Sequence, residues 1–347
     1  MEPAQRRGEE RLSKLAGTFD EDNPQAEHLQ GLLGYLKNFV VARVATDVED
    51  CNDCDVFVCH SEDMEMICRR GARFTCCVLI KDEPFNDLHM HSIDDYMRDL
   101  GILFPSQSVE IQDNHIAHKG RNGRLKNPPP QMSIKTVQAT RAKMNAVSNA
   151  QIDSTEAVNL LNMHDKTECS LPSFLHLPRF KLMTATSQSA TGKHGQRTLG
   201  DCRRFNVMGL RGSFSPAHCD LWNGTWIRNL DGVKMWNVAI DTREDEVEEW
   251  RSSERQKYWL PKKRAAIMLE KGDTLVMPPG VLVIHAPYTP TDCLLAGGMF
   301  WDFYARAQLA LNPAYIKENS DWITNEIPPG DVEWDDIVRR MQECCEA

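Results

Sequence analysis

The stretch from Gly272 to Phe300 reads GDTLVMPPGVLVIHAPYTPTDCLLAGGMF and sets the pattern of the chain around it. It contains short apolar runs at residues 274–277, 282–285 and 293–300, and turn residues such as Pro278-Pro279-Gly280 separate them. Short strands divided by Gly and Pro at regular spacing are typical of a β-sandwich or jelly roll. We therefore expect this part of the chain to form a β core.

The same texture extends over residues 204–302, with further apolar runs at 205–210 and 233–240. Outside this region the pattern is helical. Apolar residues recur at three- and four-residue steps from His28 to Arg43, and Asp331 precedes another amphipathic set. The sequence therefore predicts an α+β fold with a mainly β core, wrapped by N-terminal and C-terminal helices.

No internal repeat and no second composition regime divides the chain, so we predict one elaborated domain. Residues 1–26 are polar and charged without periodicity and are expected to form a flexible tail. The domain would then span 27–347, with a helical or mixed part at 27–200, the β core at 201–302 and C-terminal helices at 303–347. The polar stretch at 184–200 is predicted to be a loop, and Ser92 and Gly101 are predicted to begin and end a helix.

The composition is that of an ordinary globular protein, because 41% of the 347 residues are hydrophobic and 26% are charged. The formal net charge of −10 argues against a protein that coats nucleic acid or an anionic membrane. The sequence contains no run of eighteen apolar residues, and residues 1–7 lead into charge and not into an apolar signal segment. We expect an intracellular protein with no direct nucleic-acid or membrane partner.

Twelve cysteines in a chain of this kind are expected to be reduced thiols. A cluster between Cys51 and Cys77 begins with a Cys-x-x-Cys pair, which suggests a zinc knuckle, but a second such pair at the expected spacing is missing. Cys76 and Cys77 also lie in the apolar run 74–80, which reads as a buried strand. Structural cysteines are the favoured interpretation, and a metal site is the alternative.

The string Ser215-Pro216-Ala217-His218-Cys219-Asp220 places an imidazole and a carboxylate two residues apart. Residues at positions i and i+2 of a strand point to the same face, so His218 and Asp220 could bind one metal ion. His285, at the end of an apolar run, is the third candidate ligand. Two histidines and one carboxylate form a facial triad that suits Fe(II) and leaves coordination positions open. The alternative is a hydrogen-bonded surface pair together with an unrelated core histidine.

Lys234 lies in the apolar run 233–240, where an ammonium group is costly unless it meets an anion. An anionic cosubstrate would supply that partner, and the hydroxyl of Ser215 could bond the same carboxylate. The alternative is that Lys234 reaches from a strand edge to water.

With Gly224-Thr225, Gly232–Trp236 and Gly297–Phe300, these motifs follow one another in an order that resembles the Jumonji C (JmjC) family. Its members are Fe(II)- and 2-oxoglutarate-dependent oxygenases built on a double-stranded β-helix of the cupin type. The resemblance therefore implies that fold for the β core, and it implies Fe(II), 2-oxoglutarate and O2 as cofactor and cosubstrates.

By this resemblance His218, Asp220 and His285 would ligate iron, and Lys234 would pair with the distal carboxylate of 2-oxoglutarate with the help of Ser215. Asn159 resembles an asparagine that some histone demethylases of the family place against the cosubstrate. Ile227 is a departure, because it occupies a position where those demethylases carry a cosubstrate-binding tyrosine.

The implied activity is hydroxylation, or N-methyl-lysine demethylation, of a protein or peptide substrate. The acidic stretch at 241–249 could attract a basic peptide, or it could simply be a solvated helix face. Residues 262–264 are too short a basic run for a nuclear signal, and the family resemblance alone favours the nucleus over the cytoplasm. Two alternatives stay open: a catalytically silent JmjC-like binding or regulatory protein, and a cupin enzyme that uses another divalent metal.

Overall fold

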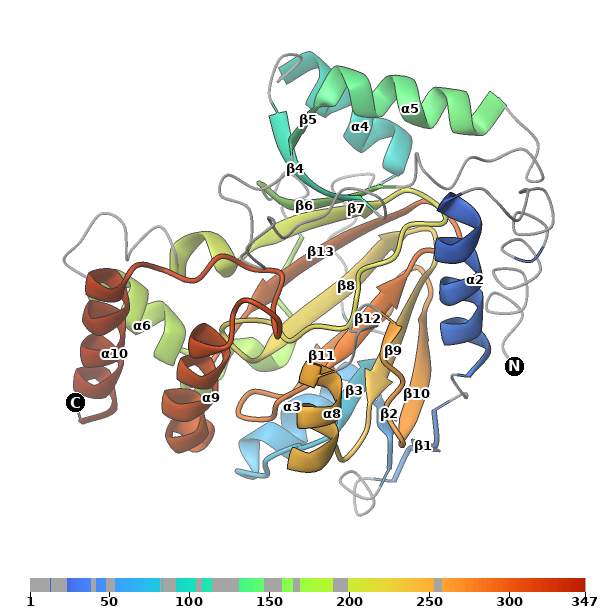
Figure 1. Cartoon of the computed structure of the whole chain (residues 1–347). Coiled ribbons are helices and arrows are strands. Elements are labelled where there is room, and N and C mark those ends of the chain that lie inside the picture. The colour runs from blue at the N-terminus through green and yellow to red at the C-terminus, as the bar shows by residue number, and fades with distance from the viewer. Residues whose placement is uncertain are drawn as a thin grey trace.

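A computed structural model describes residues 13, 24–38, 42–47, 54–81, 83, 92–103, 108–113, 131–146, 158–164, 169–189, 199–252 and 258–346. The fold of this part is α+β, with a large, mostly antiparallel sheet, a smaller sheet and surrounding helices (Figure 1). The predicted fold class is confirmed at this level.

The large sheet combines strands from both the N-terminal part and the predicted β core. Its order is β1 (Val44–Ala45), β2 (Val56–Cys59), β3 (Cys77–Ile80), β11 (Thr274–Met277), β8 (Thr225–Asp231), β13 (Cys293–Met299), β7 (Phe205–Gly209), β6 (Val158–His164), β4 (Ser108–Asp113) and β5 (Gln131–Ser133). The pairs β1–β2 and β2–β3 are parallel and the others are antiparallel. Residues before 165 therefore extend the sheet that residues after 204 form.

The central strands of this sheet are covered on both faces, which explains why the sequence shows apolar runs there in place of alternation. In β8, for example, Trp226 packs into the main core beneath the helices, whereas Ile227 packs toward the smaller sheet. All residues of β11 and β13 are buried. A strand buried on both faces reads as a nearly continuous hydrophobic run.

The smaller sheet contains β10 (Arg264–Leu269), β9 (Lys234–Ala239) and β12 (His285–Tyr288), in that order. Trp236 and Val238 of β9 form a second apolar core with Ile227 and Leu275 of the large sheet, so the two sheets face each other. The strand predicted at 282–285 begins instead at His285, because pairing with β9 runs from His285 opposite Val238 to Tyr288 opposite Met235.

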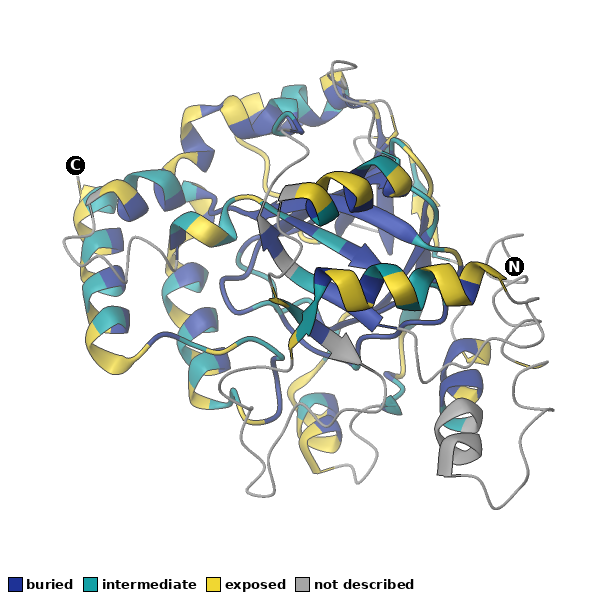
Figure 2. Cartoon of the chain, turned by 90° about the horizontal axis from the view of Figure 1, so that it is seen from above, coloured by how far each residue is buried: buried dark blue, intermediate teal, exposed yellow. Residues whose placement is uncertain are grey.

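The helices surround these sheets and bury one side each (Figure 2). They are α2 (Pro24–Lys37), α3 (Ser61–Arg69), α4 (Ile93–Leu103), α5 (Ile134–Ala146), α6 (Leu182–Ser189), α8 (Glu244–Ser252), α9 (Arg306–Glu318) and α10 (Asp331–Glu346), with short 3₁₀ turns at Ser173–His176, Pro178–Phe180 and Phe303–Ala305. Within the described residues, no helix has the length and apolar character needed to cross a membrane.

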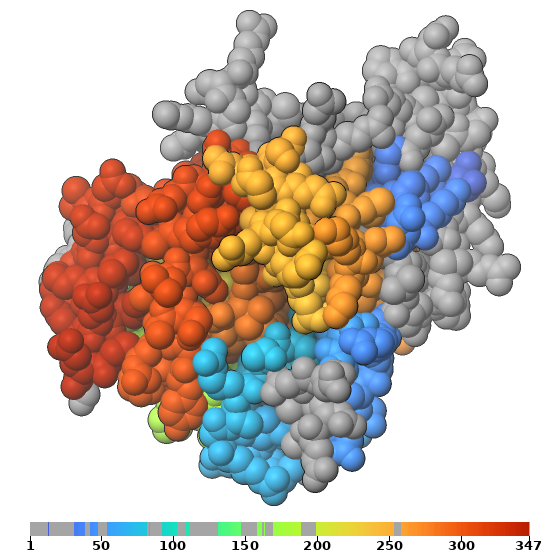
Figure 3. Space-filling view, turned by 60° about the horizontal axis from the view of Figure 1, so that its bottom comes forward, coloured from blue at the N-terminus to red at the C-terminus, as the bar shows by residue number. Residues whose placement is uncertain are grey.

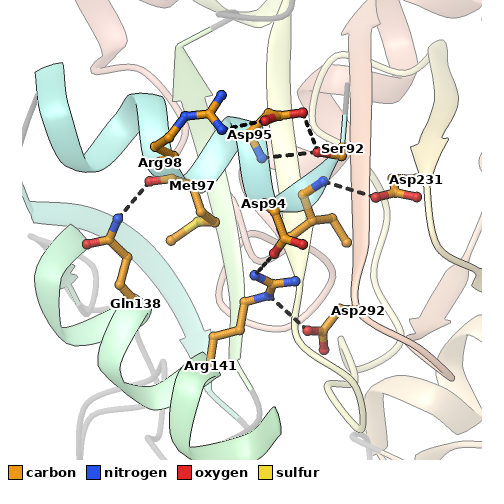
Figure 4. Close-up of polar contacts among 10 residues, drawn as sticks. Ser92, Asp94, Asp95, Met97, Arg98, Gln138, Arg141, Asp231 and Asp292 are labelled. Atoms are coloured by element: carbon orange, nitrogen blue, oxygen red, sulfur yellow. Dashed lines mark hydrogen bonds and ion pairs between the residues drawn. The ribbon is translucent and has the colours of Figure 1, made fainter. Parts of the chain in front are cut away.

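Helices α4 and α5 lie over β4 and β5 and are tied to the turns at one end of the sheet (Figures 1 and 4). The backbone N–H of Ile93 donates to Oδ2 of Asp231 at the end of β8 over 3.0 Å. Nε of Arg141 in α5 donates to Oδ2 of Asp292 over 3.0 Å, and its Nη1 lies 2.5 Å from Oδ1 of Asp94. The contacts with Asp231 and Asp292 fix the two helices to the ends of β8 and β13.

Ser92 begins α4 as predicted, because its hydroxyl accepts the backbone N–H of Asp95 over 3.1 Å. Gly101 does not end the helix, which continues to Leu103. A β-carbon at Gly101 would meet the amide end of Gln138 in α5, so the two helices pack closely there.

The predicted loop at 184–200 was wrong in part, because α6 covers Leu182–Ser189. The hydroxyl of Thr186 donates to the carbonyl of Leu182 over 2.9 Å, which satisfies this polar side chain inside the helix, and α6 packs on α10. Residues 190–198 lie outside the described part.

The boundaries of the terminal helices also differ from the prediction. Helix α2 begins at Pro24, so residues 24–26 of the predicted tail are helical, and residues 42–43 do not continue that helix. Of the rest of the predicted tail, only Ser13 is described. Asp331 is the first residue of α10 and not its cap, and it lies 2.8 Å from Nζ of Lys317.

Candidate metal centre

A pocket between the two sheets contains all six predicted site residues. It encloses about 690 Å³ of space not filled by atoms, including its opening to solvent. The predicted residues that line it are Asn159, Ser215, His218, Asp220, Lys234 and His285, and Ile227 lines it as well.

The candidate ligands come from two segments that two isolated β-bridges join, one from Phe214 to Tyr288 and one from His218 to His285. The backbone N–H of His218 donates to the carbonyl of His285 over 3.0 Å, and the N–H of His285 donates to the carbonyl of His218 over 2.9 Å. His285 begins β12, but His218 and Asp220 lie in an irregular segment, so the predicted strand around them was wrong. One potential ligand atom from each of His218, Asp220 and His285 lies within 4.8 Å of the other two.

Both imidazoles are oriented by backbone carbonyls. Nδ1 of His218 lies 2.7 Å from the carbonyl of Pro216, and Nδ1 of His285 lies 3.2 Å from the carbonyl of Val283. A carbonyl only accepts hydrogen bonds, so each Nδ1 carries the proton and each Nε2 keeps its lone pair. This is the arrangement by which proteins orient metal-binding histidines.

The carboxylate of Asp220 is held through one oxygen only. The hydroxyl of Thr225 donates to Oδ2 over 2.5 Å. Oδ1 lies 3.5 Å from Nε2 of His285. One oxygen is thus occupied by a neighbour and the other faces the imidazoles.

Burial and, to a smaller extent, the neighbouring His285 together lower the pKa of His218 to about 3, whereas Asp220 acts in the opposite direction. His218 is therefore neutral near pH 7. Metal ligation requires neutral imidazoles, so no proton has to leave this residue before a metal binds.

The chemistry of this donor set fits a divalent transition metal. Imidazole nitrogens suit Fe, Cu, Ni and Zn, and two histidines with one carboxylate are the donors of the facial triad that binds Fe(II). Within the described residues, this is the one group of three ligand side chains that could hold a metal ion.

Lys234 lies in the same pocket at the centre of a hydrogen-bonded cluster. Its Nζ donates to Oγ1 of Thr289 over 2.6 Å and to Oδ1 of Asn159 over 3.0 Å. The hydroxyl of Ser213 bridges the same two oxygens at 2.8 Å each. Nδ2 of Asn159 in turn donates to Oγ of Ser215 over 3.2 Å. The cluster connects Lys234 to both predicted cosubstrate residues, Asn159 and Ser215.

The ammonium of Lys234 is buried, with 2% of the residue exposed, so the alternative that it reaches to water was wrong. In the part of the chain that the structure describes, no carboxylate lies within ion-pair distance of it. Burial lowers its pKa, and the nearby Cys293 thiol raises it to a smaller extent. A buried cation whose acceptors are all neutral is expected to attract an anion.

Gly209 leaves room for this cluster. A β-carbon at this position would lie 2.6 Å from Oγ1 of Thr289, 3.0 Å from Oδ1 of Asn159 and 3.1 Å from Nζ of Lys234. Any side chain would therefore intrude where the ammonium and its partners meet.

Ile227 projects from β8 into the pocket and carries no hydroxyl. The apolar wall around it is completed by Leu161, Phe205, Val207, Met277 and Met299. An apolar wall beside the ligand group limits the access of water.

Sequence reasoning missed several polar residues of the site: Ser213, Thr225, Thr289 and Glu326 in its hydrogen bonds, and Glu110 and Asn325 in its lining. Thr225 and Thr289 lie within motifs quoted above, but nothing in the motifs assigns them a contact. Glu326 follows α9, far from the β core in sequence. Its Oε2 accepts the backbone N–H of Leu221 over 2.7 Å.

The acidic stretch at 241–249 contributes no residue to the pocket lining. Glu246 is buried and accepts the backbone N–H groups of Lys262 and Arg243, over 3.0 and 3.3 Å. Trp250 of the same helix packs against Trp322, so α8 adjoins the C-terminal part of the chain (Figure 3). The carboxylates that line the pocket are Asp220, Glu110 and Glu326.

The cysteine cluster shows buried and half-buried thiols. Cys59, Cys68 and Cys77 belong to the apolar core, and the sulfurs of Cys54 and Cys76 are 3.9 Å apart. Cys51 lies outside the described residues.

The fold and the pocket together define a class: an α+β protein with a candidate two-histidine, one-carboxylate metal centre next to a buried lysine. Comparison with known proteins adds one similarity, to the KK-1 biosynthesis cluster protein D of Curvularia clavata, which is 31% identical over 261 residues. The alignment covers 73% of this chain but only 24% of that protein, so the chain spans about a quarter of the relative's length. No family model matches the chain.

Proposed function

We propose that this chain is an Fe(II)- and 2-oxoglutarate-dependent oxygenase of the JmjC type, with a double-stranded β-helix formed by the two facing sheets. The observation that carries the proposal is that candidate metal ligands and a buried cation lie in one pocket, as an iron site and an anionic cosubstrate would require. A candidate triad of His218, Asp220 and His285 lies beside a buried Lys234 that has no anionic partner among the described residues.

At the metal end, Nε2 of each histidine and Oδ1 of Asp220 would hold the iron. The carbonyls of Pro216 and Val283 keep the imidazoles in the required tautomer, and Thr225 keeps the second carboxylate oxygen occupied. Such partners raise metal affinity because the ligands need no reorientation when the metal binds.

At the other end, Lys234 would pair with the distal carboxylate of 2-oxoglutarate. Asn159, Ser213, Ser215 and Thr289 surround the ammonium, and the hydroxyls can rotate to donate to the incoming anion. Because Ile227 offers no hydroxyl, Thr289 and Ser213 would provide the donors that a tyrosine supplies in related demethylases.

When bound, iron and 2-oxoglutarate would supply oxidative chemistry, in which one atom of O2 enters a substrate C–H bond and the other enters succinate, with loss of CO2. The protein's part is to hold three ligands on one side, to bind the cosubstrate and to exclude water with its apolar wall. A hydroxylated carbon would result, or demethylation if that carbon is an N-methyl group.

The substrate we propose is a protein or peptide. The pocket opens to solvent and carries Glu110 in its lining, which would suit a basic group near the metal. Glu326 also lines the pocket, but burial and the neighbouring Asp220 raise its pKa to about 8. The relative's name refers to a biosynthesis cluster, which supports an enzymatic role and makes a biosynthetic intermediate a second substrate to test.

The decisive experiment measures 2-oxoglutarate binding by calorimetry on the full chain, loaded with Fe(II) under anaerobic conditions. We expect binding to the wild type and its loss, by more than tenfold, in Lys234→Met, because a charge-assisted hydrogen bond contributes roughly 1.5–3 kcal/mol. Lys271→Ala, on an exposed turn, is the matched control and should bind normally.

Succinate formation under O2 is then measured with and without candidate peptides. Binding without turnover would favour the silent binding protein. Turnover with another divalent metal in preference to Fe(II) would favour the other cupin enzyme, and absence of both binding and turnover would refute the proposal.

A further inference from the structure

We propose that Glu326 is a positioning residue for Asp220, and that the segment after α9 is therefore a working part of the metal centre. The inference rests on the proposed function, because it assigns a role toward the same metal. It concerns a residue in the C-terminal helical region, outside the β core and outside the ligand motifs.

The backbone around Asp220 is held from both sides by this segment. The N–H of Cys219, one residue before Asp220, donates to the carbonyl of Ile323 over 2.8 Å. The N–H of Leu221, one residue after it, donates to Oε2 of Glu326 over 2.7 Å. Asp220 is thus the residue between two anchors, and the second anchor is a side chain.

These two bonds replace those that a strand would have supplied. His218 makes one bridge to His285, but the chain then leaves the sheet, and Asp220 has no partner strand. Cys219 and Leu221 are both buried, so their N–H groups need acceptors. Glu326 provides one of these acceptors and fixes where the Asp220 backbone lies.

The segment that carries Glu326 is itself well supported. The N–H groups of Trp322 and Ile323 both donate to the carbonyl of Asn319, and the N–H of Glu326 donates to the hydroxyl of Thr324 over 3.2 Å. Further along, Trp334 of α10 stacks on Trp222, with ring centroids 5.3 Å apart. Because these contacts hold the segment in place, it can keep Asp220 within the roughly 0.5 Å that a functional site requires.

Glu326 could also act on a metal through its charge alone, and two substitutions separate these roles. Glu326→Gln cannot carry a charge but keeps an oxygen that can accept from Leu221. Glu326→Asp keeps the charge but withdraws the acceptor by one methylene. Positioning predicts that Gln preserves the metal centre and Asp weakens it, whereas a charge effect predicts the reverse.

The test titrates the full-length, metal-free chain with Co(II) under anaerobic conditions and follows the visible absorption of the bound ion. We expect Co(II) affinity within about threefold of the wild type for Glu326→Gln, and about 10–100-fold weaker for Glu326→Asp and Glu326→Ala, the usual cost of losing a residue that orients a ligand. Glu318→Ala, at an exposed position in the last turn of α9, is the control and should not differ from the wild type.

Thermal unfolding of the same metal-free variants shows whether each variant is folded. A loss of Co(II) affinity counts only in a variant that unfolds at about the temperature of the wild type. Positioning is overturned if Asp binds Co(II) as tightly as the wild type, or if Gln is as weak as Ala. If Glu326→Ala does not fold, the comparison of Gln with Asp still decides; if Glu326→Asp does not fold, a Gln variant that is folded and binds Co(II) more than tenfold more weakly than the wild type overturns positioning.

Failure of this inference is distinguishable from failure of the proposed function. A wild type that binds Co(II) while its affinity is unaffected by Glu326→Asp overturns the role of Glu326 only. A wild type that binds neither Co(II) nor Fe(II) overturns the metal centre and, with it, the role of Glu326.

Discussion

The hydroxyl of Thr225 donates to Oδ2 of Asp220 over 2.5 Å, from the first residue of β8 to a segment that is not part of any strand. The bond fixes the rotation of the carboxylate, because Thr225 belongs to a strand paired on both sides. The sheet thereby sets the orientation of a ligand that lies outside it.

Replacing Thr225 by valine keeps the shape of the side chain and removes the donor. We expect Co(II) affinity to fall about tenfold or more, the range for partners that orient ligands. Thr225→Ser retains the hydroxyl and should bind Co(II) nearly as well as the wild type. Equal affinity of the valine variant and the wild type would contradict the role of this bond.

Gly209→Ala tests the space around Lys234. The added β-carbon would lie 2.6 Å from Oγ1 of Thr289, so the cluster must shift. We expect 2-oxoglutarate affinity to fall more than tenfold in calorimetry, through loss of a charge-assisted bond, while Co(II) affinity is kept. Gly34→Ala is the control, because a β-carbon there would meet nothing within 4 Å. Unchanged 2-oxoglutarate binding would show that the anion does not enter this cluster.

The lowered pKa of His218 predicts how the stability of the metal-free protein depends on pH. The folded value of about 3 lies below the unfolded value of 6.5, so the unfolded state binds more protons between them. Stability should therefore fall as pH decreases from 6.5 toward 3, by up to about 1.4 kcal/mol per pH unit from this residue.

Denaturant unfolding between pH 7 and pH 4 checks this expectation. His218→Asn should show a shallower decline than the wild type, whereas His176→Asn, at an exposed position, should not. Parallel curves for His218→Asn and the wild type would mean that His218 does not stay neutral in the fold.

Lys234→Met should stabilise the metal-free protein while it abolishes cosubstrate binding. Burial lowers the pKa of Lys234 below 10.5, so the charged form is disfavoured in the fold, and wild-type stability should rise with pH as the folded pKa is passed. Replacing buried charges with apolar side chains can add about 1–4 kcal/mol to the free energy of unfolding. Denaturant titrations at pH 7 and pH 9.5 measure it, and a less stable Met variant at pH 7 would contradict the prediction.

Much of the β core could be predicted from the sequence, because strands covered on both faces leave long apolar runs. The runs at 205–210, 233–240, 274–277 and 293–300 correspond to β7, β9, β11 and β13. The large sheet could not be predicted as a whole. Strand β3 joins it through pairing with β11, roughly two hundred positions away in sequence, which local patterns do not encode, and β2 joins through β3.

The predicted site residues meet in one pocket, although their roles stay predictions. His218, Asp220 and His285 could be found because a His-x-Asp pair and a later histidine stand in motifs whose order resembles one family. Thr225 and Glu326 could not, because a threonine in a strand and a glutamate after a helix are common and acquire meaning only through the fold. The acidic stretch at 241–249 does not line the pocket, and whether it attracts a basic peptide stays a prediction; Glu246 alone is buried, because it accepts backbone N–H groups.

The bonds from Ile323 and Glu326 to the residues flanking Asp220 also bear on the order in which the molecule matures. A ribosome releases the ligand loop long before it releases the segment that anchors that loop. We expect the nascent chain to hold both histidines and the aspartate in a loose arrangement, open to whichever metal is abundant. Selection of the metal would then be a late event in folding, completed when Ile323 and Glu326 accept the N–H groups that flank Asp220.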